Sequence, residues 1–315
     1  MASSPTEVTS AQTNALVSLS DGLAAAVERA GSATVAVNAR QRIPSSGVHW
    51  RTGVIVTSDH TVEREDDITV TLGDGRTVPA KLAGRDPSTD IAILTVEGVE
   101  VPTAAIGDTS TLKVGHTVLA IGRPGNSGLS ASFGVLSAVS GEWRTHRGGQ
   151  IDQFVRPDLT YYPGFSGGPL VDAQGQVVGI NTSGLTRGLG VAIPTSTVNR
   201  VADQILTKGR VARGYLGVGF QPVHLPDTLK NTLELPQNGG LVVVTLESNG
   251  PAEAAGVLIG DVLVALDGAS IADVENIQGM LGADRIGKPV TARIVRGGTL
   301  TEVAITVGER PQREA

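Results

Sequence analysis

Ser166, in the segment Gly164-Phe165-Ser166-Gly167-Gly168, is the side chain of this sequence whose surroundings best suit chemistry. The segment leads into the apolar pair Leu170-Val171, so we expect a sharp turn before a strand. Glycine tolerates the backbone angles of such a turn, which lets the N–H groups of Gly164 and Ser166 converge. Two convergent donors beside a hydroxyl can hold the oxyanion of an acyl-transfer intermediate. The segment therefore predicts a nucleophilic serine with its own oxyanion hole.

A nucleophilic serine needs a general base, and the base needs a group that orients it. The chain has five histidines, of which four lie in polar, turn-like or linker contexts. His60 differs because it closes the strand-like run at residues 53–57. A residue at the end of a buried strand has the fixed position that a base requires. We therefore expect His60 to be the base.

Asp90 is the candidate orienting carboxylate. It opens the apolar run at residues 91–94, so its side chain should be partly buried and should need a partner. The imidazole N–H of His60 is such a partner. Alternatively, Asp90 ends the turn at residues 86–89 and has no chemical role. The order His60, Asp90, Ser166 favours the catalytic interpretation.

Composition excludes several classes of protein. A chain of 315 residues that is 40% hydrophobic can bury one large core and one smaller core. A net charge of −6 offers no electrostatic surface for nucleic acid. The absence of cysteine excludes disulfides, thiolate metal ligands and a cysteine nucleophile. With no zinc-protease or phosphate-loop motif, we expect neither a metal nor an organic cofactor.

The pattern along the chain predicts two β-rich units joined by a helix. Leu16, Leu19, Leu23 and Val27 form an amphipathic helical stripe near the start. Between residues 32 and 194, short β-branched runs alternate with turns, and the hairpin across residues 68–78 is the clearest example. Many strands with little helix between them favour antiparallel barrels.

A second helix is predicted to close the first unit. The apolar positions with helical spacing are Val198, Val201, Ala202, Ile205 and Leu206. Thr195 or Ser196 is expected to cap this helix and Gly209 to end it. Residues 210–213 would form a short basic linker.

Six ordered blocks of the sequence resemble the HtrA/Deg family of trypsin-like serine proteases with one C-terminal PDZ domain. They lie at residues 56–62, 84–92, 163–170, 179–182, 191–194 and 213–218, and the resemblance extends from about residue 15 to residue 308. It implies a mainly β fold: a chymotrypsin-like double antiparallel β-barrel followed by an α+β PDZ domain. His60 and Asp90 would then come from the first barrel and Ser166 from the second.

The resemblance also implies domain boundaries. Residues 1–30 would be an N-terminal segment with the amphipathic helix, and residues 31–210 the protease domain. The PDZ domain would span residues 211–308, and residues 309–315 would be a polar tail.

Two substrate-binding regions follow from the resemblance. The primary specificity pocket should be lined by residues shortly before the serine and on the next strand and loop, namely Thr160, Tyr161, Ile180, Thr182 and Leu185. Thr160 stands six residues before Ser166, where trypsin-like specificity needs a buried acid, so we expect cleavage after small or medium aliphatic residues.

In the PDZ domain, the loop Tyr215-Leu216-Gly217-Val218 should receive a peptide carboxylate, and the strand after it should offer a free edge. Val274, Ile277 and Leu281 fall on one face of a predicted helix beside that groove. For Val274 and Leu281, a place in the core is an equally open interpretation.

The expected function is ATP-independent endoproteolysis of unfolded or damaged proteins, with the PDZ domain binding C-terminal or extended segments. Two residues depart from the family pattern. Phe165 replaces the usual asparagine, and Tyr161 is larger than the usual aliphatic residue. A bulky Phe165 could leave the oxyanion loop mis-set, which predicts low basal activity. The alternative is a proteolytically silent, chaperone-like or peptide-binding scaffold.

Assembly and compartment are expectations from the resemblance alone. Such proteases commonly form trimers through aromatic residues near the N-terminus, yet residues 1–30 contain none, so a homotrimer would use other contacts. No Lys or Arg precedes Arg29 and no apolar run reaches about 18 residues, so neither a signal peptide nor a membrane span is expected. The periplasm or cell envelope is implied if a leader or anchor was removed, and the cytoplasm otherwise.

Overall fold

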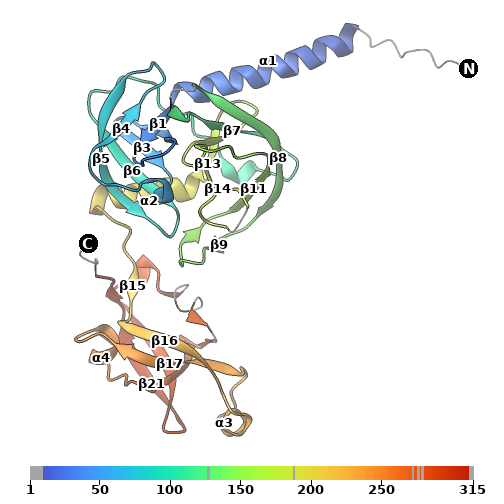
Figure 1. Ribbon diagram of the computed structural model, residues 1–315. Coiled ribbons are helices and arrows are strands. Elements are labelled where there is room, and N and C mark those ends of the chain that lie inside the picture. Colours follow the sequence, from blue (N-terminus) through green and yellow to red (C-terminus); the bar gives the residue numbers. More distant parts are fainter. Residues whose placement is uncertain are drawn as a thin grey trace, which may run out of the picture. The chain divides into compact units, whose positions relative to one another are not determined.

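The computed structural model describes residues 10–125, 128–186, 189–271, 273, 274, 277 and 280–311. The chain divides into two compact units, residues 1–210 and residues 211–315 (Figure 1). The first unit contains two closed barrels and the second an open sheet, with antiparallel pairing between the strands that form them. The predicted fold class, a double β-barrel followed by a PDZ-like α+β unit, is confirmed.

The first barrel closes in the strand order β1-β2-β3-β6-β5-β4. Its strands are β1 (Thr34–Asn38), β2 (Ser45–Arg51), β3 (Val54–Thr57), β4 (Ile68–Thr71), β5 (Thr77–Asp86) and β6 (Ile91–Val96), with a short 3-10 turn, η1 (Asp59–Thr61), after β3. Aliphatic side chains such as Val37, Ile55 and Leu94 fill the interior. The predicted hairpin is confirmed, because Thr71 of β4 pairs with Thr77 of β5.

The second barrel closes in the order β11-β14-β13-β12-β7-β8. Its strands are β7 (Thr117–Gly122), β8 (Ser130–Ser140), β11 (Phe154–Asp158), β12 (Pro169–Asp172), β13 (Val177–Thr182) and β14 (Val191–Pro194); η2 (Thr109–Thr111) precedes β7, and β9 (Trp143–Arg144) pairs with β10 (Gln150–Ile151) beside the barrel. The core of this barrel includes Phe165, which comes from the loop of the predicted nucleophile.

Helix α2 (Thr195–Lys208) packs against β5 and β6 of the first barrel and against β13 and β14 of the second. Val198, Val201, Ala202 and Ile205 are buried, as predicted, while Leu206 is exposed. Gly209 ends the helix at φ 71°, a conformation that glycine adopts without steric cost. The predicted side-chain cap is not formed: the helix begins directly after Pro194, and the Thr195 hydroxyl instead donates to the Gly107 carbonyl.

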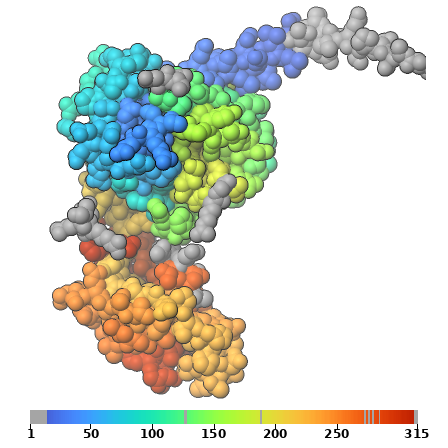
Figure 2. Space-filling view, in the orientation of Figure 1, coloured from blue at the N-terminus to red at the C-terminus, as the bar shows by residue number. Residues whose placement is uncertain are grey.

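Helix α1 (Ser10–Ser32) confirms the predicted N-terminal helix. Its last turns pack against β1, β7 and β12, where Ala26 and Ala30 are buried. Its earlier part projects beyond the barrels (Figures 1 and 2). Leu16 and Leu19 are consequently 66% and 57% exposed, so the predicted stripe is covered only toward the helix C-terminus. Among the described residues, no helix combines the length and the hydropathy needed to cross a membrane.

The second unit is built on a sheet of order β16-β17-β18-β20-β21, with β19 paired to β18. Its elements are β15 (Gly214–Tyr215), β16 (Val218–His224), α3 (Asp227–Thr232), β17 (Gly239–Leu246), α4 (Pro251–Ala254), β18 (Val262–Leu266), β19 (Ala269–Ser270), η4 (Ala283–Arg285), β20 (Pro289–Arg296), β21 (Thr299–Thr306) and β22 (Gly308–Glu309). β22 pairs with β15, so Glu309 belongs to this fold rather than to the predicted polar tail. Strand β16 lies at one edge of the sheet.

Candidate active site

The pairing of β3 with β6 brings His60 and Asp90 together. His60 lies in η1, just after β3, and Asp90 immediately precedes β6. The His60 Nδ1 atom is 2.9 Å from Asp90 Oδ1 and 2.8 Å from Oδ2. The backbone N–H of His60 also donates to Oδ1, at 2.8 Å. A carboxylate accepts only, so Nδ1 carries the proton and Nε2 is left as the basic nitrogen.

Asp90 is 3% exposed and adopts φ 57°, an uncommon conformation for a residue other than glycine. The Thr182 hydroxyl donates to its Oδ2 atom and in turn accepts the N–H of Gly184, at 2.9 Å. Sequence reasoning assigned Thr182 to the specificity pocket and missed this contact. The hydrogen bonds satisfy the buried carboxylate and fix the direction in which it holds His60.

The turn that carries His60 is held by an ion pair between Asp59 and Arg85. Asp59 is buried, and this burial raises the pKa of its carboxyl, although the Arg85 hydrogen bond acts in the opposite direction. Arg85 also donates to the Asp59 carbonyl, at 3.3 Å. Both the side chain and the backbone carbonyl of Asp59, the residue before His60, therefore contact Arg85 of β5.

Ser166 is partly exposed, and its Oγ atom lies 3.4 Å from the Oγ atom of Ser183. Ser183 is flanked by Thr182, which contacts Asp90, and by Gly184, where a Cβ atom would lie only 2.7 Å from His60 Nδ1. The segment 182–184 therefore brings the serine and the His60–Asp90 pair to one place. Among the described contacts, Ser166 Oγ has no hydrogen bond to His60, and catalytic contacts are often longer without substrate.

The loop before Ser166 leaves the two predicted oxyanion donors free. The Phe165 N–H donates to the Tyr162 carbonyl, and the Gly168 N–H donates to the Phe165 carbonyl, both at 3.0 Å. In contrast, the N–H groups of Gly164 and Ser166 donate to no acceptor within the described part of the chain. Gly164 has φ 90°, which a larger side chain would strain.

Phe165 faces away from these donors. Its ring is 1% exposed and packs in the core of the second barrel, where a Cβ atom at Gly122 would lie 2.6 Å from it. It also meets the Tyr162 ring edge to face, with centroids 5.5 Å apart. The ring thus occupies barrel core rather than space above the serine.

Tyr161, one of the predicted lining residues of the specificity pocket, packs against Gly190. Its ring lies directly over Gly190, where a Cβ atom would be 2.1 Å from two ring carbons. Its hydroxyl donates to the Val191 carbonyl at 3.1 Å, and burial raises the pKa of this phenol. The ring is therefore held in place against the segment at Gly190 and Val191.

The other predicted lining residues differ from one another. Thr160 is exposed and Leu185 is nearly buried. Ile180 and Thr182 have no exposed surface, so neither lines an open pocket in this structure. Every residue of β13 is buried, since the barrel interior covers one face and α2 packs against this strand.

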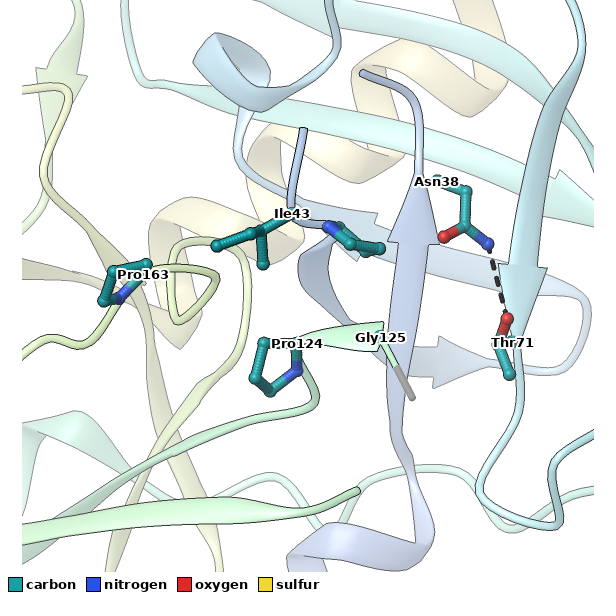
Figure 3. A pocket seen from close by; sticks show the side chains of 7 residues that line it. Asn38, Ile43, Thr71, Pro124, Gly125 and Pro163 are labelled. Carbon is teal, nitrogen blue, oxygen red and sulfur yellow. Dashed lines mark hydrogen bonds between the residues drawn. The ribbon is translucent and has the colours of Figure 1, made fainter. Parts of the chain in front are cut away.

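A groove of about 500 Å³ adjoins the serine loop at Pro163 (Figure 3). Both barrels line it, with Asn38, Ile43, Pro44 and Thr71 from the first and Pro124, Gly125 and Pro163 from the second. Its walls combine apolar side chains with the polar Asn38 and Thr71, and each of its prolines has a fixed φ angle. Sequence reasoning missed this groove, since its three prolines lie in separate loops.

In the second unit, the predicted carboxylate loop lies before the edge strand β16. The carbonyls of Leu216 and Gly217 accept the N–H groups of Ala252 and Glu247, each at 2.9 Å. The N–H groups of Leu216 and Gly217 donate to no described acceptor. Tyr215 and Val218 are half-buried. A fixed loop with free donors beside an open edge can bind an extended peptide end.

The three predicted groove residues all contact the core of this unit. Ile277 is 4% exposed within the core, so its side chain does not face an open groove. Val274 and Leu281 are half-buried and pack against the same cluster. The apolar spacing that suggested a groove face therefore reflects, at least for Ile277, the packing of the core.

Comparisons with known proteins agree with this arrangement. The trypsin-like peptidase domain family matches residues 45–180, and the PDZ domain family matches residues 214–307. The solved structure of the HtrA-type protease AlgW with a decapeptide is 31% identical, with a TM-score of 0.72 over 92% of this chain and 99% of that one. The serine endoprotease from Yersinia pestis is also 31% identical, with a TM-score of 0.70 over 91% and 97% of the two chains.

A probable periplasmic serine endoprotease, DegP-like, from Halomonas elongata is 36% identical over 280 residues, which cover 87% of this chain and 58% of that protein. The protein of the same description from Pseudomonas fulva is 37% identical over 276 residues, which cover 86% of this chain and 57% of that protein. The chain thus spans a little over half the length of these curated relatives. From its two matched domains and its likeness to solved HtrA proteases along nearly their whole length, we conclude that the chain belongs to the HtrA family of serine proteases.

Proposed function

We propose that this protein is an ATP-independent serine endopeptidase that cleaves unfolded or damaged polypeptides. The observation that carries the proposal is the His60–Asp90 pair, with Nδ1 2.8 Å from the carboxylate, beside the segment that contacts Ser166 Oγ. Similarity to serine endoproteases supports it. The same similarity does not favour the silent scaffold.

Each group has one role in the proposed reaction. Ser166 Oγ attacks the scissile carbonyl carbon while His60 Nε2 accepts its proton. Asp90 keeps His60 in the correct tautomer and stabilises the imidazolium that forms. The N–H groups of Gly164 and Ser166 hold the oxyanion. His60 then returns the proton to the leaving amine, and water repeats the sequence on the acyl-enzyme.

The site favours small or medium aliphatic residues before the scissile bond. The proposal draws on the Tyr161 ring, which restricts the space over Gly190, and on Thr160, which offers no carboxylate for Lys or Arg. The groove at Pro163 is wide and open enough to take neighbouring side chains of an extended substrate. A peptide library in which Lys or Arg is preferred before the cleaved bond would contradict this specificity.

The second unit would bind C-terminal or extended peptide segments through the loop 215–218 and the edge strand β16. The free N–H groups of Leu216 and Gly217 support a carboxylate ligand. AlgW, a relative of known structure, has been solved with a tripeptide and with a decapeptide. Such binding would deliver substrate or raise a low basal activity.

A homotrimer in the periplasm is the proposed working form. Leu16, Val17 and Leu19 on the projecting part of α1 are exposed and provide an apolar surface for subunit contact in place of aromatic residues. The curated relatives are named periplasmic. Mass photometry of the parent and of Leu16→Glu tests the assembly: the parent should be trimeric and the variant should dissociate.

Reaction with a fluorophosphonate tests the proposed chemistry. The parent should be labelled at Ser166 and should degrade casein, faster in the presence of a C-terminal peptide. Ser166→Ala should lose both labelling and degradation, a loss of about 10⁶-fold in kcat by analogy with other serine proteases. A folded parent that forms no adduct at any concentration of C-terminal peptide would refute the enzyme and support the scaffold.

A further inference from the structure

Ser46, near the start of β2, contacts both sides of the Phe165 peptide in the serine loop. Its backbone N–H donates to the Ser166 carbonyl at 3.1 Å, and its hydroxyl donates to the Gly164 carbonyl at 2.6 Å. Ser46 is fully buried, and its own carbonyl accepts the Thr57 hydroxyl at 2.7 Å. A residue fixed in the first barrel thus holds the catalytic loop of the second.

These contacts constrain the donors of the oxyanion hole. The Gly164 carbonyl belongs to the same planar peptide unit as the Phe165 N–H, which donates to Tyr162. Rotation of this unit would break a hydrogen bond at each of its ends. Because the unit links the peptide units that carry the N–H groups of Gly164 and Ser166, its two hydrogen bonds help to fix the spacing of these donors.

Arg123 connects Ser46 to helix α1. Its backbone N–H donates to Ser46 Oγ at 2.8 Å, which leaves the Ser46 proton for Gly164. Its side chain donates from Nε to the Thr34 carbonyl at 2.8 Å and from Nη2 to the Gly31 carbonyl at 3.1 Å. Gly31 lies in the last turn of α1, whose carbonyls lack intrahelical partners and attract a cation.

We propose that Ser46 is a positioning residue that sets the oxyanion loop, and that Arg123 ties this setting to the end of α1. The inference rests on the proposed function for its effect on catalysis, but the order of the loop is a property of the fold alone. Anything that displaces the end of α1 would then pull on Arg123, and through Ser46 on Gly164. The helix that carries the exposed leucines is in this way joined to the active site.

Ser45 supplies a matched control for a test of Ser46. It is the adjacent residue, is equally buried, and its hydroxyl has no hydrogen-bond partner among the described residues. Ser46→Ala and Ser45→Ala remove the same atom from neighbouring positions. Ser46→Ala should lower kcat by about tenfold to a hundredfold with little change in KM, since it acts on a part of the oxyanion hole. Ser45→Ala should change kcat by less than about twofold.

A transition-state analogue separates positioning from general damage. A peptide boronate places an oxygen in the oxyanion hole, so its inhibition constant should rise in Ser46→Ala by the factor that kcat/KM loses. A variant that is merely partly unfolded would instead bind the boronate with unchanged affinity per folded molecule. Equal kinetic parameters for Ser46→Ala and the parent would overturn the proposal.

Amide hydrogen exchange gives a readout that does not depend on activity. In the Ser166→Ala background, the amides of Phe165 and Gly168 should exchange at least about tenfold faster when Ser46 is also changed to Ala, but not when Ser45 is. Arg123→Met keeps the backbone N–H and removes the link to α1, so it should speed exchange at the end of α1 and, more weakly, in the loop. Unchanged loop exchange in the Ser46 variant would refute positioning, even if the parent proves catalytically silent. Faster exchange confined to α1 in Arg123→Met would refute the coupling.

Discussion

Asp90 and Ser166 stand at opposite ends of the proposed proton path and are held in opposite ways. The side chain of Asp90 is fixed, because it accepts hydrogen bonds from His60 and Thr182. Among the described residues, the side chain of Ser166 has one long contact, to Ser183 at 3.4 Å, whereas its backbone carbonyl accepts the Ser46 N–H. A charge that must stay in place requires a fixed side chain. A nucleophile requires a fixed backbone and a hydroxyl that is free to turn.

Among the variants that test this contrast between Asp90 and Ser166, Asp90→Asn is expected to have the largest effect on kcat. The amide can donate to Nδ1, which would favour the wrong tautomer of His60, so kcat should fall by about 10⁴-fold while the fold is kept. Stopped-time assays with a peptide substrate measure kcat, and a circular dichroism spectrum shows whether the fold is kept. A loss below about tenfold would mean that the carboxylate does not orient the base.

Thr182→Val tests how firmly the acid must be held. The substitution keeps the shape but removes the hydrogen bond to Asp90, so kcat should fall by about tenfold, equivalent to ~1.4 kcal/mol, at an unchanged KM. Thr195→Val is a suitable control, because that buried hydroxyl bonds the Gly107 carbonyl away from the triad. If both variants lost the same activity, the effect would be one of stability rather than of Asp90.

Tyr161→Phe tests the region around Ser166, because Tyr161 lies shortly before the serine loop. The ring stays over Gly190, but the hydrogen bond to the Val191 carbonyl is lost, which should lower the free energy of unfolding by about 1 kcal/mol. The preference before the cleaved bond should stay the same if, as proposed, the ring sets it. Denaturant unfolding and a peptide library measure the two quantities. A changed preference would show that the hydroxyl, not the ring, limits the pocket.

The smallest effect is expected from Ser183→Ala. A contact of 3.4 Å is at the long end of hydrogen bonding, so its loss should change kcat by less than about threefold. A loss above about tenfold would show that Ser183 holds the Ser166 hydroxyl for reaction, and that the nucleophile is as fixed as the acid.

Local patterns in the sequence predict a residue's role well where few roles are compatible with its type and its neighbours. A serine among glycines, a histidine closing a strand and an acid opening one are enough to name the candidates Ser166, His60 and Asp90. The apolar spacing of α2 and its end at Gly209 are predicted correctly for the same reason. Each of these signals lies within one short segment of the chain.

Contacts between distant segments cannot be read in this way. Thr182 has the pattern of a pocket residue, yet it lies against Asp90, 92 positions away along the chain. Phe165 suggests a disturbed loop, but its ring fills the core of the second barrel. Ser46 carries no signal at all, since a serine in a strand is common.

The sequence by itself determined which chemistry is available and that two β-rich units would carry it, because residue type and short-range periodicity act locally. The tertiary structure alone decided which hydroxyl holds Asp90 and which one holds the Gly164 carbonyl. Those choices depend on the closing of two barrels against each other. That closure brings together groups whose separation along the chain exceeds a hundred residues, as for the Ser46 hydroxyl and the Gly164 carbonyl at 118, and no local pattern records it.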